Sequence, residues 1–482
     1  MDSTNENVLL KTFFHFSAGP WLAAVISFIT TPITTYFIIP QEFGKASMYS
    51  VALSLILQVV LLGTDQSFVR MFYEVKEEER TSLLWNSLLV PVFACILCCL
   101  ILFLSRSDIS NLLFGDPDRL SPIIMLSSTL MISLFERFST LVLRMKKRGL
   151  AFSSLRVVSV VSNTLGIIFY ALFFGKSFYA VIFGSFLSNL LVCTVSISLE
   201  IKFWKKGLSL SSKKIKEVIF YGLPFVPAFL VSWLFVSMDK LALRSYSTFT
   251  EIGLYAAGNK IVAVLLLIQT GFSTFWTPIS FERFGQKDSN LFYSRIAQLL
   301  AGLMFLLSVV TITFKDFVIM FLAGAYLPAA KIMPFLIFHP LMYTVSEVTV
   351  VGINFKKRTY WHILVSILSA GVNFIGNYFL VPIYGAKGAA LSTGVAYIVF
   401  FYARTIISRK LYPVYYSVGK FTIGTITLFF VAFINTFSGM IILEILSGVI
   451  GGIIIVITYS KELNSGVRLI HRLLKKRNRD AS

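Results

Sequence analysis

Six of the charged side chains that lie within or at the ends of long apolar stretches of this 482-residue chain are candidates for a functional site. Four are basic and two are acidic: Arg70, Arg137, Arg156, Lys260, Asp65 and Glu347. An ionised group near the centre of a bilayer costs about 2.5 to 3.5 kcal/mol on insertion scales, so each should face a partner or a polar cavity. Cations placed in this way attract anionic groups, and carboxylates there commonly relay protons.

Several of these residues also have a structural interpretation. Asp65 and Arg70, in the stretch GTDQSFVRMFYE, either form a structural ion pair or serve a function. Arg137 follows Glu136 directly, and because adjacent residues do not face one another on a helix, each needs a partner elsewhere. Arg156 either snorkels to the inner interface or faces a polar site.

Lys260 is harder to explain by snorkelling. It follows Asn259 and lies seven residues from the predicted outer end of its apolar segment. Glu347 and His339 are further titratable residues in one later segment. We expect the Lys260 side chain to face a cavity rather than lipid.

The elements that position these residues are membrane-spanning helices. Only 14% of the residues are charged, 56% are hydrophobic and the mean hydropathy is +0.80, whereas soluble proteins carry about 25% charged residues. The apolar segments are apolar nearly all round, which excludes a β-barrel with its alternating polar residues. We therefore predict an all-α polytopic membrane protein with about fourteen spans. They are residues 11–39, 47–69, 83–104, 121–143, 152–174, 178–200, 217–238, 253–278, 292–314, 332–354, 362–381, 388–403, 421–436 and 440–459.

The net charge of +20 reflects topology rather than a nucleic-acid partner. With the N-terminus inside, 31 of the 43 basic residues fall in inner segments and 9 in outer segments. Cytoplasmic loops retain Lys and Arg, so both termini are predicted to be cytoplasmic, with residues 11–39 an uncleaved first span. The basic tail, residues 461–482, could also contact anionic lipid.

An internal repeat divides the chain. A shift of 210 positions aligns residues 146–184 with residues 356–394, and ten of the 39 positions are identical, including both KKR triplets. Two six-helix lobes in the same orientation follow, at residues 1–205 and 206–415. Residues 416–460 then form two additional helices. The repeat places Asn163 on Asn373, and because Asn373 and Asn377 are four residues apart on one helix face, we expect both to point into protein rather than lipid.

The first helix of each lobe carries paired prolines. They are Pro20 and Pro32 in one lobe, and Pro224 and Pro227 in the other. Proline kinks a helix, and matching interruptions point to a transport cavity, although prolines are also common in transmembrane helices. We expect both helices to be interrupted.

Signals for catalysis, metals or cofactors are weak. The sequence FGKS resembles the end of a phosphate-binding loop but lacks the first glycine, and GDPD is better explained as a solvated turn. Cys95, Cys98, Cys99 and Cys193 lie in apolar segments and are interpreted as core or lipid-facing residues. We predict no catalytic residue, no metal site and no cofactor.

Three stretches carry a resemblance to a known family. They are PQEFGKASMYS, GTDQSFVRMFYE and SMDKLALRSYSTFTEIGLYAAGNKI. On the basis of these stretches, the chain resembles the Wzx-type polysaccharide flippases of the MOP superfamily, and the resemblance covers nearly its whole length. This superfamily also contains the MATE exporters and the lipid II flippases. The resemblance does not specify a sugar.

The resemblance implies a function in surface polysaccharide synthesis, such as lipopolysaccharide O-antigen. Two lobes would flank a cavity and, by alternating access, move an undecaprenyl diphosphate-linked oligosaccharide to the outer leaflet of the bacterial cytoplasmic membrane. The expected partners are that lipid, the bilayer, and a polysaccharide polymerase with its export machinery. Lys260, Arg156, Arg137 and Arg70 are then the candidates for binding the diphosphate, and Asp65 and Glu347 for ion coupling.

Two other functions remain open at this point. A MATE-like exporter of small cations should concentrate acids rather than bases in its cavity. A polymerase or ligase acting on lipid-linked sugars should have a substantial outer loop, and the predicted outer loops have at most about 17 residues.

Overall fold

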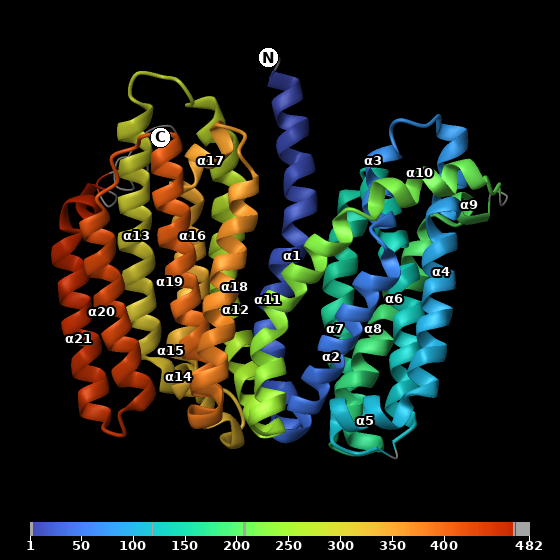
Figure 1. Ribbon diagram of the computed structural model, residues 1–482, viewed down its shortest axis with the longest axis horizontal. Coiled ribbons are helices and arrows are strands. Elements are labelled where there is room, and N and C mark those ends of the chain that lie inside the picture. The colour runs from blue at the N-terminus through green and yellow to red at the C-terminus, as the bar shows by residue number, and fades with distance from the viewer. Residues whose placement is uncertain (1–2, 118, 206–208, 466–467, 469–482) are drawn as a thin grey trace, which may run out of the picture. The chain divides into compact units, whose positions relative to one another are not determined.

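The computed structural model describes residues 3–117, 119–205, 209–465 and 468 (Figure 1). For residues 3–18 it describes the backbone only. All regular structure in these ranges is helical, which confirms the all-α prediction. The chain divides into two compact units, Met1–Leu241 and Ala242–Ser482. The division falls inside α11 (Phe225–Tyr246), and the predicted lobe boundaries at residues 205 and 415 stay a prediction.

Unit 1 is a bundle in which α7 packs along α8 and α1, and α6 packs on α8. Its core contains aromatic and aliphatic side chains of α3, α4 and α6, with Cys95 among them. The elements are α1 (Ser3–Phe37), α2 (Pro40–Leu61), α3 (Thr64–Met71), η1 (Glu77–Glu79), α4 (Arg80–Leu104), α5 (Arg106–Phe114), α6 (Ser121–Met145), α7 (Gly149–Phe173), α8 (Phe178–Leu199), α9 (Ile201–Lys205) and α10 (Ser212–Gly222).

Unit 2 repeats the pattern, because α18 packs along α19 as α7 does along α8. Helices α20 and α21 pack on one another and on α13. The elements are α12 (Phe249–Glu282), α13 (Ser289–Thr313), α14 (Lys315–Ile319), η2 (Gly324–Lys331), α15 (Met333–Leu336), α16 (Phe338–Thr349), α17 (Val351–Phe355), α18 (Tyr360–Tyr384), α19 (Ala386–Leu411), α20 (Val418–Phe437) and α21 (Ile441–Thr458).

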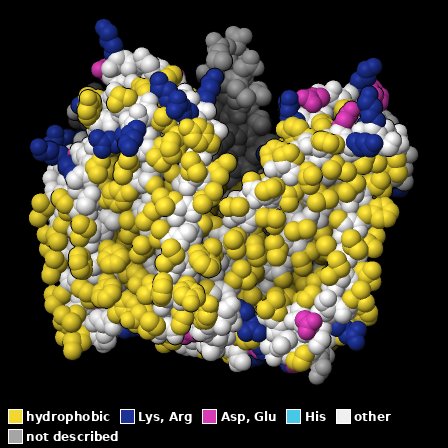
Figure 2. Space-filling view, in the orientation of Figure 1, with side chains coloured by type: hydrophobic (Ala, Val, Ile, Leu, Met, Phe, Trp, Pro, Cys, Tyr) yellow, Lys and Arg dark blue, Asp and Glu magenta, His cyan; other side chains and the backbone are white. Residues whose placement is uncertain are grey.

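The number of spans agrees with the sequence. Thirteen helices among the described residues are long and apolar enough to cross a membrane, or fourteen if one bent pair counts as a span. Figure 2 shows hydrophobic side chains over the middle of the helices and Lys and Arg side chains gathered near their ends. This distribution is what a bilayer requires of lipid-facing helices.

Three predicted spans are broken or shifted. The second span, predicted over residues 47–69, ends at Leu61, because Leu62 and Gly63 have left-handed backbone conformations with φ of 50° and 71°. The seventh, predicted over residues 217–238, is Phe225–Tyr246, preceded by the separate helix α10. The tenth, predicted over residues 332–354, belongs to the pair Gly324–Lys331 and Met333–Thr349, which bends by 56°.

The expected interruption of the first helix is wrong. Helix α1 is continuous from Ser3 to Phe37 with Pro20 and Pro32 inside it. In the second lobe, by contrast, Pro224 lies in the break between α10 and α11. A proline removes one hydrogen bond, and neighbouring helices can satisfy the freed carbonyl without breaking the helix.

The predicted inner loops gather at one end of each unit. In unit 1, Ser82 donates from its hydroxyl to the carbonyl of Ser209, and Lys214 forms an ion pair with Glu79. In unit 2, the rings of Phe284 and Phe355 lie 4.4 Å apart. Within each unit, two of the predicted inner loops therefore lie side by side, while the cytoplasmic orientation stays a prediction.

Candidate functional site

Asp65 and Arg137 form an ion pair between α3 and α6. Arg137 donates from Nη2 at 2.7 Å and from Nε at 3.1 Å to the same oxygen, Oδ2 of Asp65. The side chain of Asp65 is 4% exposed and that of Arg137 is 41% exposed. Gln66 also donates to Oδ2, while Oδ1 of Asp65 is buried without a hydrogen-bond partner in the described structure. Only one of the two carboxylate oxygens of Asp65 therefore accepts hydrogen bonds in the described structure.

An ion pair between Asp65 and Arg70 is not formed. Arg70 instead forms an ion pair with Glu74, four residues along the chain, at 2.5 Å. The side chain of Arg70 is 58% exposed and that of Glu74 is 50% exposed. The break at Gly63 places Asp65 in the first turn of α3, where it reaches α6 rather than its own helix. The prediction that Arg137 finds a partner away from Glu136 is confirmed.

Glu136 and Arg156 line a small pocket between α6, α7 and α8. Its other lining side chains are Thr140, Phe152, Leu155, Ser159 and Val192. Arg156 lies within electrostatic reach of Glu136, and its guanidinium stands 5.2 Å from the centre of the Phe152 ring. The side chain of Arg156 is exposed, and no ion pair within 4 Å holds it in the described part of the chain. This guanidinium can therefore bind an anion.

Glu347 is paired with Arg404, a residue that sequence reasoning assigned to an inner loop. Arg404 of α19 donates from Nη1 to Oε1 of Glu347 at 3.0 Å and to Oγ of Ser346 at 2.7 Å. Both charged side chains are largely buried, at 8% and 17% exposure. The guanidinium also stacks on Tyr343 and Phe400. The predicted span ended at residue 403, whereas α19 continues to Leu411, so Arg404 lies inside a helix.

Lys260 is the remaining basic candidate. It lies on α12 with an exposed side chain, next to Asn259, whose amide donates to the carbonyl of Tyr255. Its expected position facing a cavity stays a prediction. His339, in contrast, is stacked on Tyr397 with ring centres 4.2 Å apart.

Asn373 and Asn377 face protein, as predicted from their spacing. Each is 1% exposed, and Asn377 donates to the amide oxygen of Asn373. Asn373 donates to Thr393 of α19 at 3.4 Å. The two amides thus form part of the α18–α19 interface.

Two glutamates that sequence reasoning did not single out fix helix ends in the two units. Oε2 of Glu42 accepts the backbone N–H of Phe178, the first residue of α8, at 2.8 Å. Oε2 of Glu251 accepts the N–H of Ala386, the first residue of α19, also at 2.8 Å. The first N–H groups of a helix have no partner within the helix, so each carboxylate satisfies one. The shared pattern Glu-x-Gly, 209 residues apart, is the sequence signal for this role.

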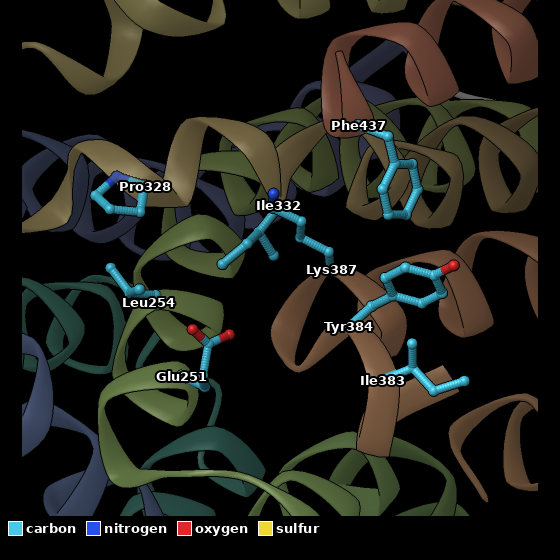
Figure 3. Close-up of a pocket in the computed structure, with 8 residues that line it drawn as sticks. All are labelled: Glu251, Leu254, Pro328, Ile332, Ile383, Tyr384, Lys387 and Phe437. Carbon is cyan, nitrogen blue, oxygen red and sulfur yellow. The ribbon is translucent and has the colours of Figure 1, made fainter. Parts of the chain in front are cut away.

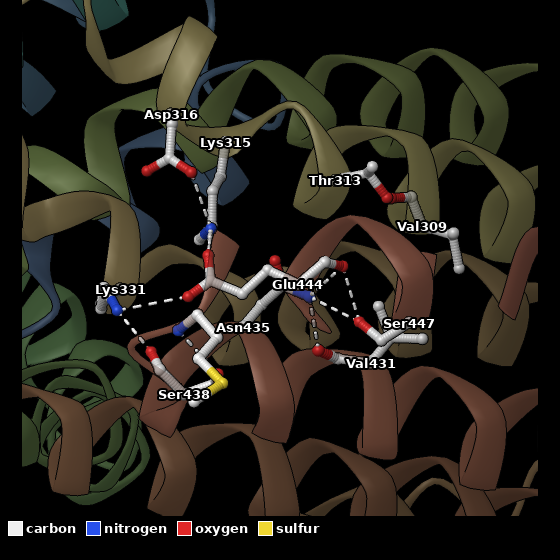
Figure 4. A network of polar contacts seen from close by, with 11 residues as sticks. Val309, Thr313, Lys315, Asp316, Lys331, Val431, Asn435, Ser438, Glu444 and Ser447 are labelled. Atoms are coloured by element: carbon white, nitrogen blue, oxygen red, sulfur yellow. Dashed lines mark hydrogen bonds and ion pairs between the residues drawn. The ribbon is translucent and has the colours of Figure 1, made fainter. Parts of the chain in front are cut away.

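A buried ionic network joins α21 to the rest of unit 2 (Figure 4). Lys315, 1% exposed, donates to Oε2 of Glu444 at 2.5 Å and to Asp316 at 2.9 Å. Lys331 reaches Oε1 of Glu444 at 3.3 Å and the carbonyl of Ser438. Both lysines lie between the predicted spans 292–314 and 332–354, in a segment that the predicted topology places outside. The structure shows that they anchor the C-terminal helices.

A pocket of about 320 Å³ opens at the same end of unit 2 (Figure 3). Its polar side chains are Glu251, Lys387 and Tyr384, and its apolar lining includes Leu254, Ile332 and Phe437. It is formed where α12, α18, α19 and α20 begin or end. Among the described residues, no group of three or more His, Cys, Asp or Glu side chains is placed to hold a metal ion.

Comparisons with known proteins identify both a family and a fold. Residues 9–284 match the model of the family described as polysaccharide biosynthesis protein. A search among curated proteins finds no match.

Solved membrane proteins share the fold over most of the chain. The lipid II flippase MurJ in an inward closed conformation matches with a TM-score of 0.68 and 16% identity, over 92% of this chain and 99% of MurJ. A mutant of the MATE transporter VcmN of Vibrio cholerae matches with a TM-score of 0.53 and 15% identity, over 85% and 98% of the two chains. An inward-facing multidrug resistance MATE transporter of the MOP superfamily matches with a TM-score of 0.53 and 15% identity, over 83% of this chain and 94% of that transporter.

Proposed function

Because this chain belongs to the polysaccharide biosynthesis protein family, we propose that it is a flippase for a lipid-linked oligosaccharide. Its substrate is an undecaprenyl diphosphate-linked sugar repeat unit of a surface polysaccharide such as O-antigen. The protein moves this lipid from the inner to the outer leaflet of the bacterial cytoplasmic membrane by alternating access. It performs no covalent chemistry and delivers its product to a polymerase and the export machinery.

The match to MurJ supports this proposal most directly. That protein is named for flipping lipid II, and the chain shares its fold over nearly the full length of both. The family match adds a link to polysaccharide synthesis. A flippase for lipid-linked sugars is the function on which the two findings agree.

The cationic side chains supply the chemistry that a diphosphate requires. Arg156 is the strongest candidate, because its guanidinium is exposed, lines a pocket and has no close ion pair in the described structure. A guanidinium binds phosphate oxygens with two parallel hydrogen bonds. Lys260, Arg137 and Arg70 are the other proposed contacts, of which Arg137 and Arg70 already hold acids.

The acids that hold arginines suggest how an ion gradient could be coupled. Asp65 holds Arg137, and Glu347 holds Arg404. Protonation of either carboxylate would weaken its ion pair and free a guanidinium for the anionic substrate. We propose Asp65 and Glu347 as coupling residues on this basis.

Reconstituted vesicles test the proposal. A fluorescent undecaprenyl diphosphate-linked oligosaccharide becomes accessible to an impermeant quencher only after it crosses the bilayer. We expect the purified protein to move it, Arg156→Ala to slow transport at least tenfold, and Arg156→Lys to retain part of the rate because the charge survives. Arg144→Ala is the matched control, since Arg144 is an exposed arginine at the end of α6.

Absence of transport by the wild-type protein would contradict the proposal. A small-molecule exporter is the second candidate, supported by the MATE fold. The same vesicles loaded with a labelled organic cation distinguish the two, because a flippase should leave that cation unmoved.

A further inference from the structure

The pocket at the ends of α12, α18, α19 and α20 contains one carboxylate and one ammonium that are not paired with each other. Glu251 lies on one side of the space, and Tyr384 and Ile383 lie on the other (Figure 3). No ion pair joins Glu251 to Lys387 in the part of the chain that the structure describes. The volume of about 320 Å³ is at the lower end of the range for small-ligand sites, roughly 300 to 1,000 Å³.

Comparison of the two units shows what is unusual about Glu251. Its counterpart Glu42 fixes a helix end in the same way, but it also forms an ion pair with Lys45 at 2.9 Å. When the two Glu-x-Gly patterns are aligned, with an offset of 209 residues, Lys45 corresponds to Leu254, which lines the pocket. Glu251 therefore keeps the structural role while it lacks the cation that neutralises its counterpart. One oxygen accepts a hydrogen bond from the N–H of Ala386, and no hydrogen bond or ion pair of the other oxygen is found among the described residues.

Lys387 supplies the opposite charge. It lies in the first turn of α19, partly exposed, and no ion pair or hydrogen bond of its ammonium exists within the described ranges. The pocket therefore presents a negative group and a positive group to the same small volume. A ligand that carries both charges would satisfy both groups at once.

The apolar walls show what else the ligand should carry. Tyr384 and Phe437 pack edge to face with ring centres 5.2 Å apart, and Ile383 beside them is 70% exposed. Because the pocket lies where apolar helices end, it is at the level at which the head groups of membrane lipids lie. A lipid whose acyl chains continue along Ile383 and Phe437 fits this arrangement.

We propose that the pocket binds the phosphoethanolamine head group of a zwitterionic phospholipid. The phosphate lies against the Lys387 ammonium, and the ethanolamine ammonium lies against the Glu251 carboxylate. An anionic lipid without an amine would leave Glu251 unpaired, and a neutral sugar would leave both charges without a counterion. The proposed site is separate from the cationic residues of the flippase mechanism and does not depend on it.

Native mass spectrometry of the full-length protein tests the proposal. The protein is released from micelles that contain equal amounts of phosphatidylethanolamine and phosphatidylglycerol, and the retained lipid is identified. We expect phosphatidylethanolamine to be retained about tenfold over phosphatidylglycerol, which corresponds to one charge-assisted contact. Lys387→Gln removes the contact to the phosphate that both lipids carry, so it should lower the retention of phosphatidylethanolamine about tenfold, whereas Lys410→Gln, at the opposite end of α19, should leave this retention unchanged.

Leu254→Lys is the second variant. It restores the pairing seen between Glu42 and Lys45, so it should neutralise Glu251 and abolish the preference without removing the cap on α19. Equal retention of both lipids by the wild-type protein would overturn the proposal, as would unchanged retention of phosphatidylethanolamine by Lys387→Gln or a preference that survives Leu254→Lys. Displacement of the lipid by free N-acetylglucosamine, but not by phosphoethanolamine, would assign the pocket to a sugar and would equally overturn it.

Discussion

Lys147 and Lys357 share one backbone conformation, with φ of 57° and 56°, at positions 210 residues apart. The turns that follow also agree. The N–H of Arg148 donates to Leu143 at 3.0 Å, and the N–H of Arg358 donates to Ile353 at 3.1 Å. Both KKR triplets therefore end a helix with the same left-handed turn, which is what the internal repeat predicts.

Glycine at either lysine should stabilise the protein. A non-glycine residue in the left-handed region costs about 1 to 2 kcal/mol, and both side chains are exposed. We expect Lys147→Gly and Lys357→Gly each to raise the melting temperature in detergent, by an amount equivalent to roughly 1 kcal/mol. Lys146→Gly is the control, because its φ of −80° is ordinary. A lower melting temperature in both glycine variants would contradict the assigned turns.

The ion pair of Asp65 should contribute more to stability than the pair of Glu74. Asp65 is buried and holds a half-exposed arginine, whereas Arg70 and Glu74 are both exposed. We expect Asp65→Ala to destabilise the protein by about 1 to 3 kcal/mol, and Glu74→Ala by less than about 0.5 kcal/mol. Thermal unfolding of the two variants measures the difference. Equal losses would mean that Asp65 is not held by Arg137 in the membrane.

Lys260 should contribute to transport rather than to folding. We expect Lys260→Ala to reduce export of the polysaccharide at normal expression and Lys260→Arg to retain part of it, because the charge survives although its geometry changes. The measurement is polymer yield per inserted protein. Normal export by Lys260→Ala would remove this residue from the substrate contacts.

Glu444 should hold the C-terminal helices in place. Its carboxylate binds Lys315 and Lys331, and its loss leaves a buried ammonium at Lys315 without its closest partner. We expect Glu444→Ala to cost about 3 kcal/mol and to speed proteolysis between α20 and α21. Glu462→Ala, which breaks the more exposed pair with Lys420, should have a much smaller effect. Similar proteolysis of both variants would show that the network does not anchor α21.

The orientation in the membrane can be tested at the start of α10. Ser212 is exposed and lies in a segment predicted to be cytoplasmic from the distribution of basic residues. In a background without cysteine, Ser212→Cys should react with an impermeant maleimide only after the membrane is opened. Labelling of intact cells would reverse the predicted topology.

The sequence by itself determined the features that depend on composition and local periodicity. Long apolar segments require helices in a bilayer, so the all-α fold and the number of spans followed directly. The repeated KKR triplet marked two equivalent turns, and the spacing of Asn373 and Asn377 placed them on one buried face. These conclusions need only the helical repeat and the cost of burying polar groups.

Only the tertiary structure decided which charges pair. Asp65 holds Arg137 rather than Arg70, Arg404 joins Glu347 from a segment assigned to a loop, and Lys315 is buried. Each partner lies on another helix, tens of residues away, and its reach depends on the rotation and axial register of two packed helices. Helix packing angles and offsets are set by side-chain interdigitation along the whole contact, which a local sequence pattern does not encode.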